Sequence, residues 1–592
     1  MRFILLAIIS AFTSGFSSQT VTLLYGPYLQ QGAPTSMIIC WRTDVACDSK
    51  VKFGLTKYNL SFTNTDANAV IQHSVSVSGL VPNTKYYYTA CNSTNSFTCD
   101  TFYFYTAPLP NTNQKIRIVA TGDCGTGQPT QVNVRKALMY NLNNKYVNCW
   151  LLLGDNAYYS GTDLEYTNLF FTPYQNNFIM HNTCLFPCIG NHDYANNAAF
   201  QENKAVPYFS IFNLPSNGQL GGIPSNTEAY YSYNYGNVHF VSVDSYGTET
   251  SLRVYDTLSP HYQWLKQDLQ NDNSTWTIVY FHHPPYTMGS HNSDFEGELV
   301  NIRTFLTPLF EKNKVDVVLN GHSHNLERSW MIKGHIGNEA SFTPTLHIKD
   351  NSSARYDGST NSCAYIKDTI TNKGVVYTVC GSSGWVTSTQ PTYPHDAMYY
   401  SNTLKGMAGF IEVDANRLSA SFIGEDSLIH DKFTIFKNIK KNKVIWVQPF
   451  QTIVLSASWN GNYVWSVNAP KTKTNLFTFA GGYKIYVRDS LNCFADTFHI
   501  QIGTGITELE KNETRFFPNP VINNIISVEM SSSDKINSAS ISDLNGKEIK
   551  IQKFETENNE VKLYLPDLAS GEYLIKLITD KGLISRKIIL RE

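Results

Sequence analysis

Short runs of alternating apolar and polar residues, separated by turn residues, fill the chain between residues 21 and 107. They read "SMIICWRT", "SKVKFGL", "HSVSVSGL", "TKYYYTACN" and "DTFYFYTAP". Successive side chains of a strand point to opposite faces, so this alternation predicts half-buried β-strands. Several such strands in succession predict a β-sandwich, which we place at residues 19–108.

The pattern changes at Ile116, where the apolar runs become continuous and each ends in a loop rich in Gly, Asp, Asn or His. These runs read "IRIVATGDCG", "CWLLLGDNAY", "CLFPCIGNHDY", "VHFVSVDS", "TIVYFHHPPY" and "VDVVLNGHSH". The segments "PTQVNVRKALMYNLNN", "HYQWLKQDLQN" and "LVNIRTFLTPLFEKNK" between them are typical of helices. Buried strands alternating with helices predict an α/β domain at residues 115–436, with its site at the carboxyl ends of the strands.

Two further strand-rich modules are expected after this domain. Residues 443–503, with "VWSVNAP" and "FTFAGGYKIYVRDSLNC", indicate an immunoglobulin-like sandwich. Residues 512–592 contain "FFPNPVINNIISVEM", an Asn-Gly turn in "SISDLNGKEI" and a late "SGEYLIKLITDKG". This last stretch resembles the C-terminal sorting domain of the type IX secretion route. The resemblance implies that the type IX machinery is a partner. It also implies a secreted or outer-surface protein, exported through the periplasm of a Gram-negative bacterium.

The amino terminus supports export. One Arg precedes an apolar run in "MRFILLAIISAFTSGFSSQT", which predicts a signal peptide at residues 1–18. No later run approaches the length of a transmembrane segment. The net charge of −2 gives no broad basic face for a nucleic acid. Export permits disulfides, and four of the 11 cysteines (Cys40, Cys47, Cys91 and Cys99) cluster early enough to form two bridges.

Five loops of the α/β domain carry side chains of the kind that bind metal ions. They are Asp123 in "GDCG", Asp155 and Tyr158 in "GDNAY", Asn191 and His192 in "GNHDY", His282 and His283 in "FHHPPY", and His322 and His324 in "GHSH". One Gly-Asp turn is most often an Asx-turn that holds its own backbone. Five such loops in one domain instead favour a two-metal hydrolase, in which a carboxylate such as Asp155 bridges two cations. Mixed nitrogen and oxygen ligands suit Zn, Mn or Fe, and a Tyr158 phenolate favours Fe(III).

The ordered motifs "DCG", "GDNAY", "GNHD", "VYFH" and "GHSH" resemble those of purple acid phosphatases, a branch of the calcineurin-like metallophosphoesterases. The strand corner "GLVPNTKYYYTA" resembles the fibronectin type III-like domain that precedes the catalytic domain in that family. The resemblance covers roughly residues 20–436 and implies a fibronectin III-like β-sandwich followed by an α/β metallophosphoesterase sandwich. Together with the two small β modules, this predicts a multidomain fold.

The resemblance also assigns the metal ligands. It implies Fe(III) at a position formed by Asp123, Asp155, Tyr158 and His324. It implies a divalent ion (Zn, Mn or Fe(II)) at a position formed by Asp155, Asn191, His282 and His322. His192 is expected beside the substrate phosphate, together with Asn191.

The implied activity is that of an acid phosphatase, which hydrolyses small phosphate monoesters by attack of a metal-bound hydroxide. His291 in "SHNSDFEGE" is the candidate proton donor for the leaving group. His283 stands where many family members have Ser, and it is either a substrate contact or a supporting group. Cys124 in "GDCG" could be considered as a nucleophile, but it has no neighbouring base in the sequence. Metal binding already accounts for the composition of its loop.

Two alternatives stay open at this point. A phosphodiesterase or nucleotidase would use the same metal centre with different pocket walls. A surface-binding protein with an inert enzyme-like domain belongs to a different class, and five loops with intact ligands argue against it.

Overall fold

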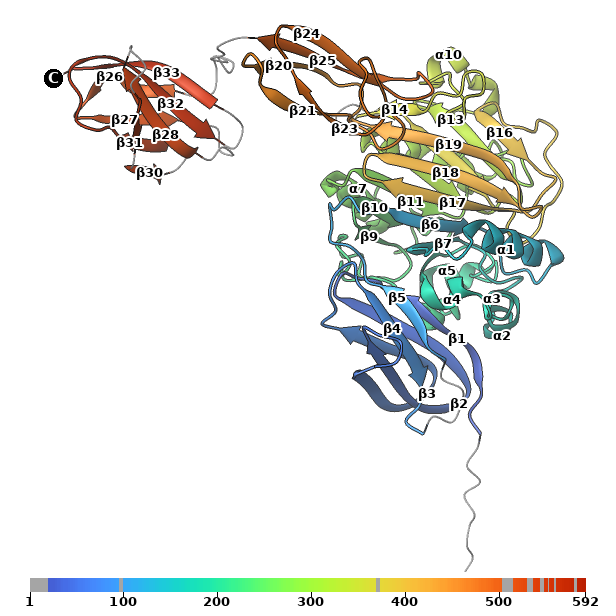
Figure 1. Ribbon diagram of the computed structural model, residues 1–592. Helices are drawn as coiled ribbons and strands as arrows, with labels where there is room; N and C mark the ends of the chain where they lie inside the picture. Colours follow the sequence, from blue (N-terminus) through green and yellow to red (C-terminus); the bar gives the residue numbers. More distant parts are fainter. Residues whose placement is uncertain are drawn as a thin grey trace, which may run out of the picture. The chain divides into compact units, whose positions relative to one another are not determined.

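The computed structural model describes residues 20–94, 100–368, 373–502, 515–529, 536–543, 548–551, 553–557, 560–579 and 583–591. The predicted signal peptide (1–18), Cys99 and the first residues of the predicted 512–592 module lie outside these ranges. The chain forms two compact units (Figure 1). The first reaches to Ile439 and includes Ser458–Gly461 and Leu491–Cys493, and the second contains the rest of the carboxyl-terminal part.

The amino-terminal strands are β1 (Leu23–Gln30), β2 (Ser36–Gly54), β3 (Phe62–Ser78), β4 (Lys85–Cys91) and β5 (Phe102–Tyr105). The runs "SMIICWRT" and "SKVKFGL" belong to the single strand β2, whose pairing with β3 shifts register between Arg42 and Cys47. The expectation of two early disulfides is wrong in part. Cys40 and Cys47 are free thiols, whereas Cys91 is disulfide-bonded.

One large sheet joins these strands to the α/β domain. Its order is β14-β19-β18-β17-β6-β7-β8-β1-β2-β4-β5, with β3 paired to β2. The new strands are β6 (Ile116–Thr121), β7 (Cys149–Leu153), β8 (Cys184–Cys188), β14 (Tyr365–Lys367), β17 (Met407–Asp414), β18 (Arg417–Gly424) and β19 (Ile429–Lys437). The parallel pair Leu29↔Cys184 links β1 to β8, so the sheet runs on from one domain into the other.

A second sheet faces the first. Its order is β16-β13-β15-β12-β11-β10-β9, with β9 (Tyr231–Tyr235), β10 (Val238–Ser242), β11 (Trp276–Phe281), β12 (Val317–Asn320), β13 (Leu326–Ile332), β15 (Val375–Cys380) and β16 (Met398–Asn402). Strand β11 shows how the layers form. Ile278 and Tyr280 join the core shared with the first sheet, and Val279 and Phe281 join a separate core on the other face. This alternation is what a strand buried on both faces requires.

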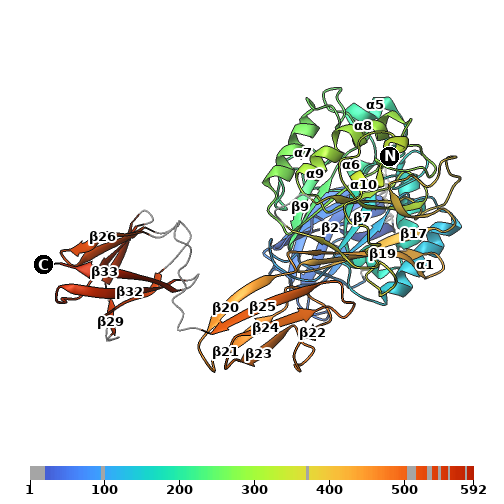
Figure 2. The ribbon, with the colours of Figure 1, turned by 90° about the horizontal axis from the view of Figure 1, so that it is seen from above.

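Helices cover the outer face of the second sheet. They are α7 (Pro260–Asn271), α8 (Gly297–Phe305) and α9 (Thr307–Lys312), which lie together in Figure 2. The segment "LVNIRTFLTPLFEKNK" is two helices rather than one, because Pro308 cannot donate the backbone hydrogen bond that a continuous helix needs. The predicted helix at 129–144 is α1 (Pro129–Leu142). Shorter helices are α2 (Asp163–Glu165), α3 (Thr172–Tyr174), α4 (Phe178–Asn182), α5 (Ala198–Asn203), α6 (Tyr208–Ile211) and α10 (Pro344–His347), with a π-turn at Tyr166–Phe171 and a 3-10 turn at Glu339–Ser341.

The second unit consists of strands. Its first module has β20 (Asn442–Val447), β25 (Ala495–Ile502), β24 (Tyr483–Arg488) and β22 (Val464–Trp465) in one sheet, and β21 (Thr452–Ser456) with β23 (Thr474–Thr478) in another. The last module has the order β29-β28-β32-β33-β26-β27-β31-β30. Its strands are β26 (Arg515–Ile522), β27 (Ile525–Glu529), β28 (Ile536–Asp543), β29 (Glu548–Ile551), β30 (Lys553–Glu557), β31 (Glu560–Tyr564), β32 (Gly571–Thr579) and β33 (Leu583–Leu590). The predicted multidomain class, with strand-rich modules after an α/β sandwich, is confirmed.

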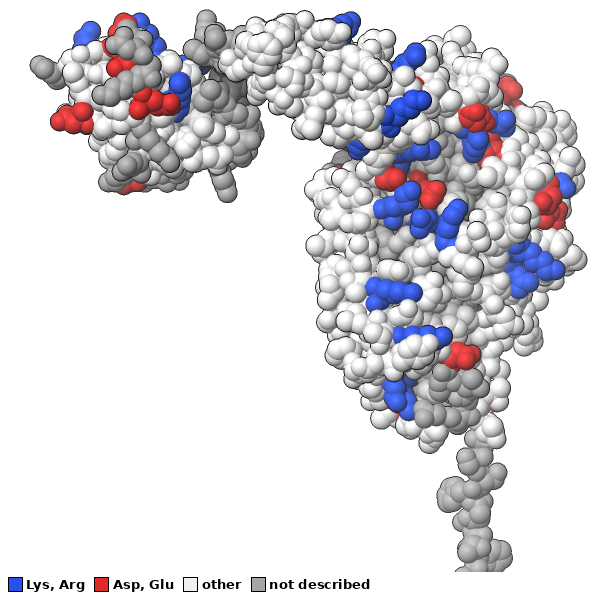
Figure 3. Space-filling model, viewed as in Figure 1, with Lys and Arg blue, Asp and Glu red and all other residues white. Residues whose placement is uncertain are grey.

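Some of the basic side chains on the face of the first unit that Figure 3 shows are paired with acidic ones. Arg117 lies 3.1 Å from Glu412, and Lys115 lies 3.4 Å from Asp414. Within the described part of the chain, no helix combines the length and apolar character needed to cross a membrane.

Candidate metal centre

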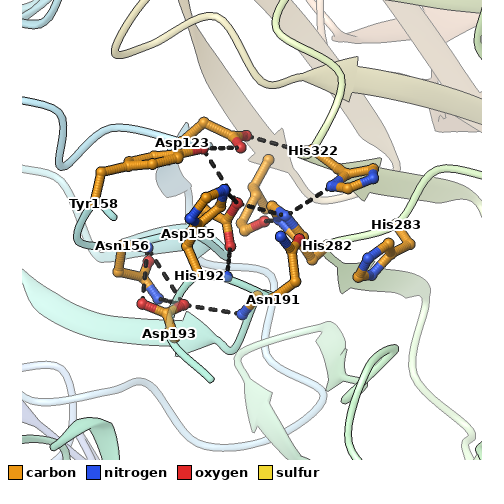
Figure 4. A network of polar contacts seen from close by, with 12 residues as sticks. Asp123, Asp155, Asn156, Tyr158, Asn191, His192, Asp193, His282, His283 and His322 are labelled. Atoms are coloured by element: carbon orange, nitrogen blue, oxygen red, sulfur yellow. Dashed lines mark hydrogen bonds and ion pairs between the residues drawn. The ribbon is translucent and has the colours of Figure 1, made fainter. Parts of the chain in front are cut away.

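The five predicted loops meet in space because their strands end at one edge of the two facing sheets. Strands β6, β7 and β8 of the first sheet are parallel neighbours, as are β11 and β12 of the second. Three loop residues have left-handed backbones: Asp123 with φ 55°, Asp155 with φ 50° and His322 with φ 66°. Such conformations are uncommon for residues other than glycine and gather at functional sites. Figure 4 shows the side chains converging from these loops.

Tyr158 joins the side chains of the predicted Fe(III) position. Its hydroxyl donates to Asp123 Oδ1 at 2.8 Å, and the same oxygen lies 3.1 Å from Asp155 Oδ2 and 3.2 Å from His324 Nε2. Burial and the two carboxylates raise the pKa of Tyr158 well above its usual value. The phenol therefore keeps its proton until a cation offsets the carboxylate charge, so metal binding and ionisation of Tyr158 are coupled.

Asp155, His282 and His322, three of the four residues predicted to hold the divalent ion, lie together. Asp155 Oδ2 is 3.1 Å from His282 Nε2, which is 3.2 Å from His322 Nδ1. One ligand atom from each of the three lies within 4.8 Å of the others. His282 Nδ1 is 2.9 Å from the carbonyl of Leu153, an acceptor that places the proton on Nδ1 and leaves Nε2 free to bind an ion.

The electrostatics of this position suit a cation. Although burial raises the pKa of Asp155, its histidine neighbours, His282 foremost, hold that pKa well below the usual value. Although burial lowers the pKa of His282, the carboxylates of Asp155 and Asp123 raise it to about 9. Burial, together with the charge of His291, lowers the pKa of His322. An ionised Asp155 beside a neutral His322 suits a metal ion, and His282 would release the proton on its Nε2 when the ion binds.

Asn191 supplies an independent observation that supports metal binding. Its Nδ2 donates to Asn196 Oδ1 at 2.7 Å, which fixes the amide orientation. Its Oδ1 is buried and has no hydrogen-bond partner among the described residues. A buried oxygen without a donor is costly unless a cation or a water satisfies it. The donor set therefore fits a metal ion held by Asn191, Asp155 and the two histidines.

His192 lies at the mouth of the site. Its backbone N–H donates to Asp155 Oδ1 at 2.8 Å, and its Nδ1 is 2.7 Å from the Tyr159 carbonyl. Its ring is 4.5 Å from the ring of Tyr158, centroid to centroid. The side chain is 23% exposed, so it lines the opening rather than the core.

The neighbouring Asp193 holds this loop in place, a role that the sequence did not indicate. Its carboxylate accepts from the backbone N–H groups of Asn156 and Gly190 and from Tyr166 Oη at 2.6 Å. Burial, with the nearby charge of Asp155, raises its pKa to about 7. Asp193 is part of the "GNHD" motif, but the groups that donate hydrogen bonds to its carboxylate can be identified only from the fold.

His291 does reach the site. Its ring stacks on His322 with 3.6 Å between centroids, and its Nδ1 lies 2.8 Å from Glu296 Oε2. The same carboxylate oxygen is 3.7 Å from His322 Nε2. Although burial raises the pKa of Glu296, hydrogen bonds with His291 and His322 hold it well below its usual value. The segment "FEGE" thus contributes a carboxylate to the site, a role that sequence reasoning did not assign.

His283 is buried beside the metal ligands. Its Nδ1 is 2.8 Å from Ser245 Oγ, and its ring lies 4.3 Å from the ring of His322. Burial and the charge of His322 lower its pKa well below the usual value. Its predicted contact with substrate stays a prediction. Cys124 is also fully buried, and burial raises its pKa to about 12, which is unlike a nucleophilic thiol.

Comparison with known proteins agrees with this geometry. The model for calcineurin-like phosphoesterases matches residues 116–326, and the model for the purple acid phosphatase N-terminal domain matches residues 25–106. The model for the secretion system C-terminal sorting domain matches residues 515–591. The last of these implies secretion by the type IX route.

Curated relatives carry the same family name. Purple acid phosphatase 15 of Arabidopsis thaliana is 29% identical over 284 residues, which are 44% of this chain and 49% of the relative. A probable inactive purple acid phosphatase 9 of the same plant is 36% identical over 163 residues, 24% of each chain. The chain thus spans about half of the length of the first relative.

Among solved structures, the purple acid phosphatase PPD1 from yellow lupin (Lupinus luteus) seeds has a similar fold. The TM-score is 0.54 at 17% identity, and the match covers 69% of this chain and 74% of that one. The described domains, the strand-end motifs and these matches agree: residues 25–106 and 116–326 resemble the N-terminal and catalytic domains of purple acid phosphatases, within the calcineurin-like phosphoesterases.

Proposed function

We propose that this protein is a secreted acid phosphatase that hydrolyses small phosphate monoesters at a dinuclear metal centre. The observation that carries the proposal is the convergence of Asp123, Asp155 and Tyr158 with histidines, next to the unpartnered buried oxygen of Asn191. Carboxylates, imidazoles, an amide oxygen and a phenol form a donor set that suits Fe(III) and a divalent ion.

The residues divide between two ions. Fe(III) would be held by Asp123, Asp155, Tyr158 and His324. A divalent ion (Zn, Mn or Fe(II)) would be held by Asp155, Asn191, His282 and His322, so that Asp155 serves both. When bound, the two ions supply positive charge for phosphate oxygens and acidify a water nucleophile.

The protein's own side chains provide the remaining steps. His192, partly exposed and 3.9 Å from Asp155 Oδ2, is placed to donate to a phosphate oxygen beside the ligands. His291, oriented by Glu296, is placed to protonate the leaving alcohol. His283 packs against His322, and its Nδ1 is bonded to Ser245. It would contact substrate through the part of its ring that faces away from Ser245.

Metal analysis together with a visible spectrum tests this proposal. The purified protein should contain Fe and a second metal, show a tyrosinate-to-Fe(III) band and hydrolyse p-nitrophenyl phosphate at acid pH. Tyr158→Phe should remove or shift the colour while the far-UV circular dichroism stays unchanged. Asp155→Ala should lose both ions, because it serves both positions.

The outcomes separate the alternatives. Colourless protein with two divalent ions, cleaving diesters or nucleotides faster than monoesters, would point to a phosphodiesterase or nucleotidase. Inactive protein that holds no metal would point to a surface-binding role. Full activity of Asp155→Ala would refute the shared-ligand assignment.

A further inference from the structure

A sixth strand end also borders the metal centre, and it carries no metal-ligand side chain. Strand β15 runs parallel to β12 and is followed by the segment Gly381-Ser-Ser-Gly-Trp385. This segment contains no Asp, His or Asn, so its sequence does not predict a site. Its position depends on the pairing of β15, which no local pattern reveals.

The loop is fixed against two of the metal-binding loops. A Cβ added at Gly384 would lie 2.0 Å from the carbonyl oxygen of Asp123, and one added at Gly381 would lie 2.3 Å from the carbonyl oxygen of Ser323. Thr126 Oγ1 donates to the Gly384 carbonyl at 3.1 Å. This close packing leaves Trp385 little freedom to move away from the site.

Trp385 directs its indole N–H at a predicted metal ligand. Nε1 lies 3.2 Å from His324 Nε2, and the ring is 5.4 Å from the ring of Tyr158, centroid to centroid. The same His324 nitrogen faces Tyr158 Oη at 3.2 Å and Asp123 Oδ1 at 3.5 Å. It is therefore the nitrogen that His324 offers to an ion.

A nitrogen lone pair given to an ion is not available to a hydrogen-bond donor. An indole N–H only donates, and among the residues that the structure describes it donates to His324 Nε2. Once His324 binds metal, this donor is left at the edge of the centre and requires another acceptor. An oxygen of the bound phosphate group is the acceptor that the site itself brings there.

We propose that Trp385 is a substrate-binding residue, whose indole N–H donates to a non-bridging oxygen of the tetrahedral oxyanion held at the metal centre. This inference rests on the proposed phosphatase function and deepens it. Tyr159, which is 59% exposed and 6.0 Å from the Trp385 ring, flanks the same edge of the opening. A neutral donor here strengthens oxyanion binding without adding charge beside Fe(III).

The test is equilibrium binding of inorganic phosphate to the metal-loaded, full-length protein by calorimetry. Trp385→Phe keeps an aromatic ring and removes the N–H. Loss of one hydrogen bond to a charged group should weaken phosphate binding by about tenfold to a hundredfold, with metal content unchanged. Trp446→Phe, a 49% exposed tryptophan outside the catalytic unit, is the matched control and should bind phosphate like the wild type.

An unchanged phosphate Kd in Trp385→Phe, with both ions retained and hydrolysis by the wild type intact, overturns the inference and leaves the proposed function standing. A wild type that holds no metal and does not hydrolyse esters overturns the function itself. If Trp385→Phe loses its ions, wild-type protein labelled with 5-fluorotryptophan and loaded with Zn²⁺ decides. The Trp385 ¹⁹F resonance, assigned with the metal-free variant, should shift when phosphate is added, and a resonance that stays in place refutes the contact.

Discussion

At the residue scale, His291 and Glu296 form a histidine–carboxylate pair at the edge of the candidate metal centre, with 2.8 Å between Nδ1 and Oε2. The carboxylate fixes the ring where a leaving alkoxide would need a proton. Alkyl esters depend on that proton, whereas p-nitrophenolate leaves readily without it. We therefore expect His291→Ala to lower kcat for an alkyl phosphate by about 10²–10⁴-fold, and kcat for p-nitrophenyl phosphate far less.

Steady-state kinetics with both substrates checks this prediction. His430→Ala is the matched control, because His430 also pairs with a carboxylate, Asp426 at 2.9 Å, but lies outside the site. Equal losses of kcat for the two esters in His291→Ala would remove His291 as the proton donor.

The second prediction at the residue scale concerns the effect of Glu327 on stability. It is fully buried, accepts a hydrogen bond from Thr287 Oγ1, and burial raises its pKa from 4.5 to about 7. The folded state therefore holds this proton more tightly than the unfolded state. Its contribution to the free energy of unfolding is complete below about pH 4.5, falls as pH rises, and is lost above about pH 7.

Glu327→Gln removes this dependence. The loss of stability that Glu327 causes between those pH values amounts to about 3 kcal/mol. Thermal unfolding of both proteins from pH 4.5 to pH 8 should show that the Tm of the variant increases relative to the Tm of the wild type as pH rises. A difference in Tm that does not change with pH would contradict the buried, protonated carboxyl.

At the element scale, the turn after β7 depends on one glycine. Gly154 has φ 85°, and a Cβ added to it would lie 2.5 Å from His282 Nδ1. That nitrogen is the one whose bond to Leu153 aims Nε2 at the divalent position. Gly154→Ala should therefore displace His282 and weaken binding of the divalent ion by more than about tenfold, because misplaced ligands lose their ion.

Gly79→Ala separates this effect from backbone strain alone. Gly79 also has a positive φ, 73°, but a Cβ there meets nothing within 4 Å. It should cost about 1 kcal/mol of stability or more and leave the metal content unchanged. Gly154→Ala protein with a full complement of both metals, measured by elemental analysis, would refute the close approach to His282.

The loops of the candidate metal centre could be predicted to come together because each lies directly after a continuous apolar run and carries side chains that can bind metals. Asp123 and His322 can be identified as candidates in this way without knowing which strands pair. The roles of Glu296 and Trp385 could not be predicted in this way, because they depend on contacts across the fold. Glu296 lies beside the stacked rings of His291 and His322, and the position of Trp385 depends on the pairing of β15. The joining of the two domains through Leu29↔Cys184 is likewise a matter of strand pairing, which periodicity does not encode.

At the scale of the whole molecule, catalysis and export are assigned to different parts of the chain. All of the predicted metal ligands, from Asp123 to His324, belong to the first unit. The sorting domain at residues 515–591 belongs to the second. The first unit and the last module have separate hydrophobic cores, so they are expected to fold independently of each other.

A chain that ends at residue 502 tests this separation. We expect it to bind the same metals as the full-length protein and to hydrolyse p-nitrophenyl phosphate with the same kcat, because no predicted ligand is removed. In a host with a type IX secretion system, the shortened chain should stay inside the cell envelope while the full-length chain reaches the surface or the medium. Fractionation with activity assays measures both results, and the full-length Asp155→Ala protein controls for export without catalysis. A shortened chain that is exported normally would show that another segment carries the sorting signal, whereas one that is retained but inactive would show that the last module supports the metal centre.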